Sequence, residues 1–254
     1  TESTINSLTR EDFIDYHKRM YGRDSTVLVI VSDMNADEVF ALCAKHLEGN
    51  PFVNNGVATV SPNILTGSNK LYRFGRPNIQ QTYLMGMYAD KGMADDDRAK
   101  KMCMLGGLGG GMFSLFFKEI REKLGLCYTV WAYSYLANAD SSAIALYSQT
   151  DQTKAEQARQ KMLEIIADVK ANGFSKEIFA CAKAEQLGGF CRRNSSVSGI
   201  ANLVGKAKVF GRDIDFNQSY QDILDLTLDG VNAYAKEHLP EPDDIYWSIM
   251  EPGE

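Results

Sequence analysis

Five glycines precede an aromatic-rich segment in residues 106–130, GGLGGGMFSLFFKEIREKLGLCYTV, and a glycine-rich turn before a helix often binds a phosphate. The spacing does not fit the two common phosphate motifs. A P-loop needs Lys and then Ser or Thr after its last glycine, but Met112 and Phe113 follow Gly111. The dinucleotide fingerprint also breaks, because Met112 occupies the position of its last glycine. We therefore expect no nucleotide site here but a tight helix-to-helix turn, in which the glycines supply positive φ angles and close approach.

The helix expected at residues 112–124 carries a charged side chain that could do chemistry. An apolar stripe runs along this helix, and Gly125 stops it at the position expected of a C′ residue. Arg121 lies at the flank of the stripe, where its stem could be covered while its guanidinium reaches outward. Tyr128 follows early in a predicted strand. Taken alone, Arg121 fits a solvated residue or a binding group, and Tyr128 fits a sheet residue or a catalytic one.

Metal ligands are sparse in the sequence. The three histidines, His17, His46 and His238, lie far apart, and none belongs to His-x-x-Glu-His or His-Glu-x-x-His. Cys43 and His46 could place two ligands on one helical face, but no second pair lies nearby to complete a tetrahedral site. No Gly-x-Ser-x-Gly elbow and no Cys–His pair stands out for nucleophilic catalysis. We expect neither a metal site nor a cofactor site in this chain.

The composition is that of a globular protein of 254 residues with a net charge of −6. A nucleic-acid binder normally carries a basic patch, which a chain of this negative charge does not show. No apolar stretch approaches the roughly 20 residues needed to span a bilayer. Five cysteines at irregular spacing argue against a disulfide framework and favour a reducing compartment such as the cytoplasm, with the periplasm left open. The first residues lack a starting Met and the layout of a signal peptide, so we expect the chain to be part of something longer.

Hydrophobic periodicity and turn residues predict mixed secondary structure. The expected helices cover 8–21, 35–49, 93–105, 112–124, 151–171, 175–192 and 196–210. In the first of them Thr9 is the expected N-cap, with Asp12 three residues on. The expected strands cover 26–32, 80–88, 126–136 and 141–150, with a turn at 137–140 and a last helix and strand within 226–250.

The ending of the chain repeats its beginning. Residues 8–31 and 226–249 align without gaps, with Leu8 on Leu226 and Tyr16 on Tyr234. Either this is chance between two capped helix–strand units, or each copy closes a domain. On the second interpretation, 1–49 is the terminal helix–strand–helix of a preceding homologous domain, 50–69 is a linker, and 70–254 is a complete second domain.

The segment 108–130 resembles the pitrilysin/insulinase family of inverted-zincin peptidases. Their second, non-metal-binding domain carries Leu-Gly-Gly-Gly-Met, a small-residue pair, and then Phe-x-Glu-Ile-Arg-Glu-Lys-x-Gly-Leu-x-Tyr-x-Val. The matching positions are Gly109–Met112, Ser114, Phe117, Glu119–Lys123, Gly125, Leu126, Tyr128 and Val130. The likeness extends along almost the whole chain, but Phe113 and Leu115 depart from the pattern, where the family often has a second small residue and an Arg.

The resemblance implies an α+β fold in which helices pack on a mixed, mainly antiparallel sheet. In such enzymes two related domains close around an unfolded peptide. The first domain holds zinc through His-x-x-Glu-His and a distal Glu, and the metal polarises the scissile carbonyl and activates water. An Arg and a Tyr of the second domain reach the peptide near the scissile bond, and they map onto Arg121 and Tyr128. The implied roles are an Arg hydrogen bond to a substrate carbonyl and a Tyr hydrogen bond to the oxyanion.

We therefore expect the substrate-clamping, non-metal half of a zinc endopeptidase that acts on peptides or unfolded segments. Alone it should be inactive, and its zinc should lie in a missing N-terminal domain or in a partner subunit. The expected partners are a peptide substrate and that zinc-bearing part, as a homodimer or heterodimer, with no nucleic acid and no membrane. The alternative is a non-catalytic partner or structural subunit of the same fold, because some relatives keep the fold but have lost zinc.

Overall fold

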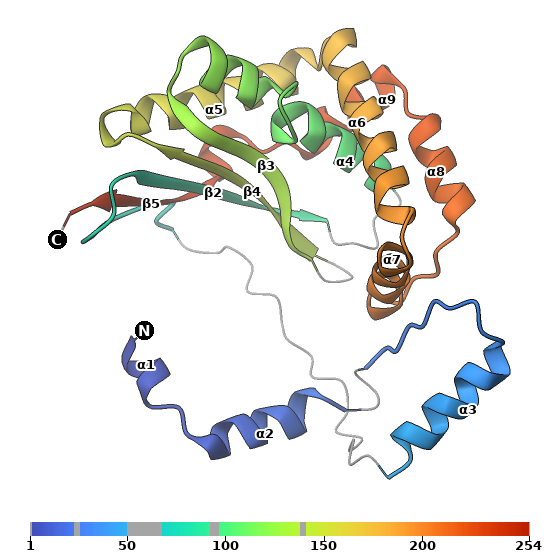
Figure 1. Ribbon diagram of the computed structural model, residues 1–254. Helices are drawn as coiled ribbons and strands as arrows, with labels where there is room; N and C mark the ends of the chain where they lie inside the picture. Colours follow the sequence, from blue (N-terminus) through green and yellow to red (C-terminus); the bar gives the residue numbers. More distant parts are fainter. Residues whose placement is uncertain (1, 23–25, 50–67, 92–96, 138–140, 254) are drawn as a thin grey trace. The chain divides into compact units, whose positions relative to one another are not determined.

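In a computed structural model, the chain consists of two compact units (Figure 1). The structure describes residues 2–22, 26–49, 68–91, 97–137 and 141–253. The first unit, here the helical unit, comprises Thr1–Pro62 and Asn194–Asp213, and the second, here the sheet unit, comprises Asn63–Arg193 and Ile214–Glu254. The linker expected at 50–69 and the turn expected at 137–140 fall almost wholly outside the described residues, and the predicted domain boundaries stay a prediction. None of the helices within the described ranges has both the length and the hydrophobicity needed to cross a bilayer.

The helical unit contains α1 (Glu2–Asn6), α2 (Arg10–Met20), α3 (Ala36–Leu47) and α7 (Val197–Val209). The predicted N-cap of α2 is confirmed. The Thr9 backbone N–H donates to an Asp12 carboxylate oxygen at 2.8 Å, and the Asp12 N–H donates to Thr9 Oγ1 at 3.3 Å, which is a capping box.

The prediction of a strand at 26–32 is wrong, because these residues form no strand in the structure. A strand needs a neighbour to receive its backbone hydrogen bonds, and the strands of the described residues all belong to the sheet unit. The side chains of Val27, Leu28 and Ile30 are 43%, 60% and 48% exposed. The β-branched run therefore has strand propensity without a strand partner.

The sheet unit is built on five strands in the order β1-β5-β2-β4-β3. They are β1 (Leu71–Arg76), β2 (Thr82–Lys91), β3 (Cys127–Ala137), β4 (Ser141–Thr150) and β5 (Tyr246–Pro252). β1 pairs with β5 in parallel, and the other three pairs are antiparallel. The mixed, mainly antiparallel sheet of an α+β fold is therefore confirmed. β1 escaped prediction because its partner lies far along the sequence.

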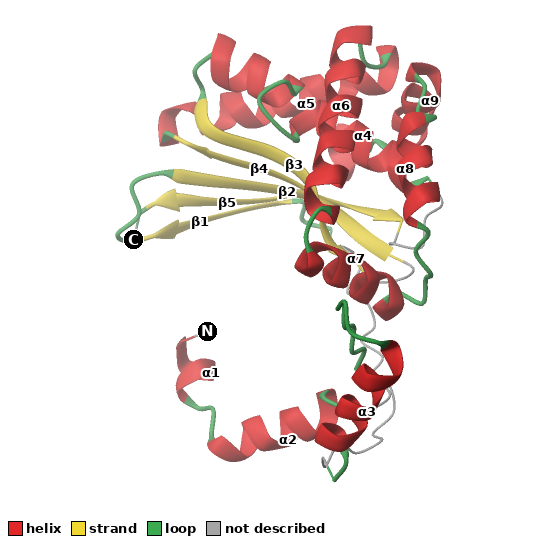
Figure 2. Cartoon of the chain, turned by 45° about the vertical axis from the view of Figure 1, so that its right-hand side comes forward, coloured by secondary structure: helices red, strands yellow, loops and turns green. Residues whose placement is uncertain are grey.

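Helices cover one face of this sheet (Figure 2). They are α4 (Arg98–Gly109), α5 (Ala155–Asn172), α6 (Lys176–Asn194), α8 (Phe216–Leu224) and α9 (Leu228–His238), with short 3₁₀ turns at Gln152–Lys154 and Pro242–Asp244. The core lies between these helices and the sheet, where Leu84, Leu146, Ile166 and Ile249 are fully buried. α8 was not among the predicted helices.

The glycine-rich turn differs from its prediction in two respects. α4 continues through the first three glycines and ends at Gly109, so the glycines do not break the helix at residue 106. None of the glycines at 106–111 has a positive φ. Their role is close approach: a Cβ on Gly109 would lie 2.8 Å from the Trp131 carbonyl carbon and 2.9 Å from the Phe116 ring, and it would clash with the Ala132 backbone nitrogen. Glycine lets the end of α4 pack directly on β3.

Candidate functional site

Two backbone irregularities flank Gly125. The helix that follows the glycine turn is a π-helix over Phe117–Lys123, a wider form that is rare and often found at functional sites. Gly125 has a φ of +56°, as expected for the predicted C′ residue. The Leu126 N–H donates to the Ile120 carbonyl at 3.0 Å, across six residues, and this bond closes the wide last turn.

The second irregularity is a β-bulge at the start of β3. Cys127 pairs with Thr150 and Thr129 pairs with Gln149, which leaves Tyr128 without an opposite residue on β4. The Tyr128 side chain is 74% exposed. A bulge redirects the side chain of the extra residue, so Tyr128 turns away from the buried core that Val130 and Ala132 face.

Arg121 and Tyr128 meet in the structure. The Arg121 guanidinium carbon lies 4.5 Å from the centre of the Tyr128 ring and 4.6 Å from the centre of the Phe117 ring. The guanidinium therefore lies against both aromatic rings, in cation–π contact with each. No carboxylate pairs with Arg121 anywhere in the described ranges, so its five N–H donors remain available to a ligand. Both residues were candidates from the sequence, and they meet where the π-helix ends and the bulge begins.

The backbone that carries this pair is held from β4 and from the start of α5. Thr150 Oγ1 donates to the Leu126 carbonyl, and Ser148 Oγ donates to the Thr129 carbonyl at 3.1 Å. Lys154 Nζ donates to the Gly125 carbonyl at 3.0 Å. These bonds satisfy carbonyls that the bulge and the helix end would leave unpaired, and they fix the position of the turn.

Cys127 adjoins the pair but is not a good nucleophile. Burial raises the pKa of its thiol above the ordinary value, while a hydrogen bond with Ser148 and the charge of Arg121 act in the opposite direction. A thiol with a raised pKa stays protonated near neutral pH, and the thiolate is the reactive form.

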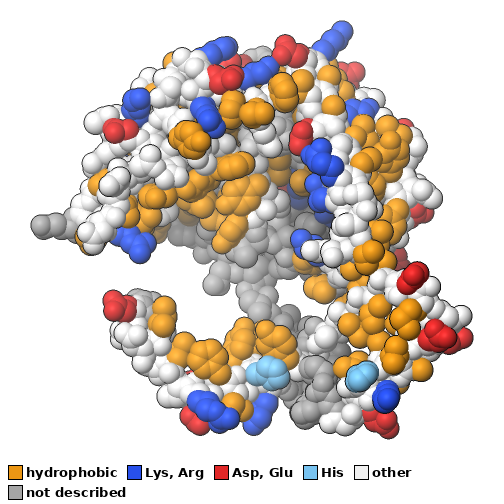
Figure 3. Space-filling view, viewed as in Figure 1, with side chains coloured by type: hydrophobic (Ala, Val, Ile, Leu, Met, Phe, Trp, Pro, Cys, Tyr) orange, Lys and Arg blue, Asp and Glu red, His pale blue; other side chains and the backbone are white. Residues whose placement is uncertain are grey.

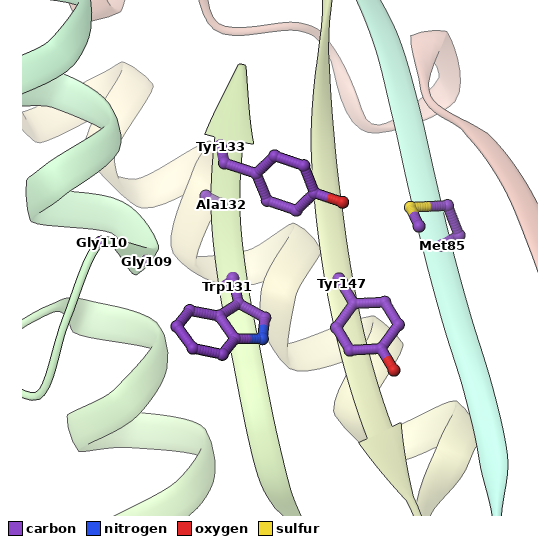
Figure 4. Close-up of a pocket in the computed structure, with 7 residues that line it drawn as sticks. All are labelled: Met85, Gly109, Gly110, Trp131, Ala132, Tyr133 and Tyr147. Carbon is purple, nitrogen blue, oxygen red and sulfur yellow. The ribbon is translucent and has the colours of Figure 1, made fainter. Parts of the chain in front are cut away.

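The sheet face opposite the helices is largely apolar. One row across it runs from Trp131 to Tyr147, Met85, Ser248 and Tyr72 through direct strand pairings. Figure 3 shows hydrophobic side chains gathered over β3 and β4 on this face. A shallow pocket forms there around Met85, Trp131, Tyr133 and Tyr147 (Figure 4). This pocket was not predicted from the sequence, although the aromatic residues at every second position of β3 were a signal for it.

The histidines do not come together as metal ligands. His17 stacks on Tyr21 with ring centres 4.9 Å apart, and His238 lies 4.1 Å from Tyr234. Within the ranges that the structure describes, no group of three His, Cys, Asp or Glu side chains could hold a metal ion. The described side chains therefore do not fit a zinc site, and the location of zinc in another domain or subunit stays a prediction.

Comparisons with known proteins connect this geometry to a family. The chain matches the family described as peptidase M16 inactive domain over residues 7–186. An uncharacterised zinc protease of Mycobacterium leprae is 25% identical over 243 residues, which are 94% of this chain and 54% of that protein. A Helicobacter pylori protein named non-peptidase homolog YmxG is 23% identical over 98% of this chain and 57% of its own length.

A solved structure shows the same fold. The crystal structure of a peptidase M16 inactive domain from Pseudomonas fluorescens superimposes with a TM-score of 0.84 at 21% identity, over 99% of this chain and 60% of that one. The present chain spans little more than half the length of the curated relatives named above. The family match confirms the family predicted from residues 108–130, and this chain belongs to the peptidase M16 inactive domain family.

Proposed function

We propose that this chain is the peptide-clamping, non-metal half of a zinc-dependent endopeptidase that acts on peptides or unfolded segments. The observation that carries the proposal is the Arg121 guanidinium, which lies against the rings of Phe117 and Tyr128 with its donors unpaired in the described ranges. The names of several relatives as zinc proteases support it. The zinc belongs to a preceding domain or to a partner subunit, and the proposed partners include that part and the peptide.

The two side chains have separate roles in this proposal. Arg121 donates hydrogen bonds to a backbone carbonyl of the bound peptide and so orients it. The Tyr128 hydroxyl donates to the oxygen of the scissile carbonyl as negative charge develops there. Phe117 also contacts the guanidinium and restricts it, which lowers the entropy lost on binding.

Replacing Tyr128 by Phe in the full-length protein, with its zinc-bearing part, tests the catalytic role. Loss of one oxyanion donor should lower kcat roughly 10- to 1000-fold with little change in KM, because the bond forms mainly in the transition state. Turnover of a fluorogenic peptide measures both constants. Tyr135→Phe is the matched control, since Tyr135 is an exposed tyrosine on the same strand and should leave kcat unchanged.

Equal turnover of the Tyr128→Phe variant and the wild type would contradict the assignment. Arg121→Lys adds a second measurement, because Lys keeps the charge but loses the planar fork of donors. That variant should raise KM for a peptide substrate more than it changes the thermal midpoint of unfolding. An unchanged KM would remove Arg121 from the binding site.

A second candidate function is a non-catalytic partner or structural subunit. It is favoured by the Helicobacter pylori relative, which is named a non-peptidase homolog, and by the family description as an inactive domain. Zinc content and peptidase activity of the full-length protein separate the two candidates. One zinc per protein with metal-dependent peptide cleavage supports the enzyme, whereas cleavage that appears only with a second, zinc-bearing subunit supports the partner role.

A further inference from the structure

The open face of the sheet contains a pocket that Arg121 and Tyr128 do not line. Its volume is about 370 Å³, and it lies over β2, β4 and the edge strand β3. Its walls are Met85, Trp131, Tyr133 and Tyr147, and at the edge strand β3 it extends to Ala132 and to Gly109 and Gly110 at the end of α4. In Figure 4 the Trp131 and Tyr147 side chains lie beside each other, and the Tyr133 ring extends across β4 toward Met85.

The lining selects for an apolar occupant. No charged side chain lines the pocket, so a charged group would lose its hydration without gaining an ion pair. The thioether of Met85 and three aromatic rings favour another aromatic ring or a branched aliphatic group. Burial, followed by the neighbouring Tyr83 and Tyr133 hydroxyls, raises the pKa of Tyr147, so its hydroxyl stays protonated and neutral near pH 7.

The pocket and the candidate site share strand β3. Trp131 and Tyr133 follow Tyr128 by three and five residues on β3. At the rise of a strand these separations are about 10 and 16 Å. An extended peptide advances by nearly the same distance per residue, so a chain held at Tyr128 passes the pocket about three to five residues away.

We propose that this pocket binds one aromatic or large aliphatic side chain of an extended peptide, about three to five residues from the residue that contacts Arg121 and Tyr128. The inference rests on the proposed function and gives it a substrate preference. A volume of about 370 Å³ has room for one large side chain, and the shared strand β3 connects the pocket to the peptide-contacting pair. A second copy of this chain is the competing occupant, and the experiment below includes it.

The test measures peptide binding by the full-length protein, purified with any subunit that accompanies it. The probes are fluorescein-labelled peptides of about 12 residues, roughly 40 Å when extended, made of Gly, Ser and Thr with one variable position. That position carries Phe, Leu, Asp or Lys, and a chelator prevents turnover. Fluorescence anisotropy gives the Kd. The Phe and Leu peptides should bind about tenfold tighter than the Asp and Lys peptides.

Variants of the pocket residues test whether the preference for Phe and Leu peptides comes from the pocket. Trp131→Ala and Tyr147→Ala should each reduce the ratio to within about threefold, because each removes one wall. Tyr72→Ala is the matched control: Tyr72 is an exposed aromatic in the same cross-strand row, at the opposite edge of the sheet, and its removal should keep the tenfold ratio. Circular dichroism and the thermal midpoint confirm that each variant is folded.

The remaining outcomes separate the pocket from the proposed function. If the tenfold preference for the Phe and Leu peptides persists in both Trp131→Ala and Tyr147→Ala, the pocket proposal is wrong. It is also wrong if Tyr72→Ala lowers this preference as much as the two pocket variants do. If Trp131→Ala abolishes a dimer in solution and leaves the ratio unchanged, the face belongs to a second copy and the pocket proposal is wrong. Arg121→Ala should weaken all four peptides alike. If it has no effect while the pocket variants do, the pocket stands and the role of Arg121 fails; if no peptide binds, both proposals fail.

Discussion

The two faces of the five-stranded sheet are built by the same strands but present different side chains. On β4, Leu146 faces the helices and is fully buried, whereas its neighbour Tyr147 lines the pocket on the opposite face. On β3, Ala132 is 3% exposed, while Trp131 and Tyr133 are 49% and 37% exposed. Each pair of neighbours divides between the two faces because strand side chains alternate with a period of two residues.

The difference between the two faces shows which apolar side chains stabilise the fold. An antiparallel sheet with one solvated face usually carries polar residues there, but here both faces are rich in apolar groups. The helix-covered face buries its apolar groups within the sheet unit and gains free energy from doing so. The open face keeps aromatic groups partly in water, which adds little to stability and fits a ligand-binding surface.

The largest expected effect comes from a charge buried on the covered side. Lys101 Nζ lies 2.5 Å from an Asp90 carboxylate oxygen, and the two side chains are 5% and 2% exposed. Lys101→Met should lower the free energy of unfolding by about 3–5 kcal/mol, because the Asp90 carboxylate stays buried without its counter-ion. Urea titration followed by circular dichroism measures this. Lys123→Met is the matched control, since Lys123 pairs with Glu119 at an exposed site and should change stability by less than about 1 kcal/mol.

Asp90→Asn added to Lys101→Met sharpens this test. The neutral amide removes the buried charge, so the double variant should recover part of the lost stability. A Lys101→Met variant no less stable than Lys123→Met would show that water reaches the pair and that the covered side is less dry than the structure indicates.

The neighbouring residues of β4 provide a direct comparison of the two faces. Leu146→Ala should lower the free energy of unfolding by about 2–5 kcal/mol, because it leaves a cavity in the core. Tyr147→Ala removes a larger side chain but should cost only about 1 kcal/mol, since that ring lies on the open face. Urea titration of both variants measures the difference. Equal losses would mean that the open face also holds the sheet unit together.

The glycine turn tests the contact between α4 and β3. Gly109→Ala should destabilise by about 1–3 kcal/mol, because the new Cβ would press on the backbone of Trp131 and Ala132. Gly111→Ala is the control: a Cβ there meets no atom within 4 Å, so stability should stay the same or rise slightly. Thermal midpoints measured side by side decide the matter. A Gly109→Ala variant as stable as Gly111→Ala would contradict the close packing.

Local signals predicted much of this fold. The strands at 126–136 and 141–150 agree with β3 and β4 to within one residue at each end, because alternation and the intervening turn are local. The N-cap at Thr9 and the stop at Gly125 were predicted from residue type, since one side chain or one φ angle decides each. The roles of Arg121 and Tyr128 could be proposed only from the family resemblance, because neither residue is distinctive alone.

The failures depend on distant partners or on backbone detail. The run 26–32 has the propensity of a strand, but pairing decides whether a strand forms. β1 is short and its partner lies more than 170 residues away, at Tyr246–Pro252. The π-helix at Phe117–Lys123 is a backbone detail that has no residue pattern of its own. To predict the pocket, the register of three strands would have to be known, and it cannot be read from the sequence.

The smallest expected effect compares a buried thiol with an exposed one across pH. Cys103 in α4 is 1% exposed, and burial raises the pKa of its thiol to about 11. Since this pKa is higher in the folded than in the unfolded state, where it is about 9, the contribution to stability is complete well below pH 9 and is lost as the pH rises toward 11. Between pH 8 and pH 10 the free energy of unfolding should fall by roughly 1 kcal/mol from this thiol. Urea titrations at both pH values should show a smaller fall in the free energy of unfolding for Cys103→Ala than for the wild type. Cys191→Ala is the control, because Cys191 is exposed and its replacement should leave this fall unchanged. An identical pH dependence in all three proteins would mean that water reaches Cys103.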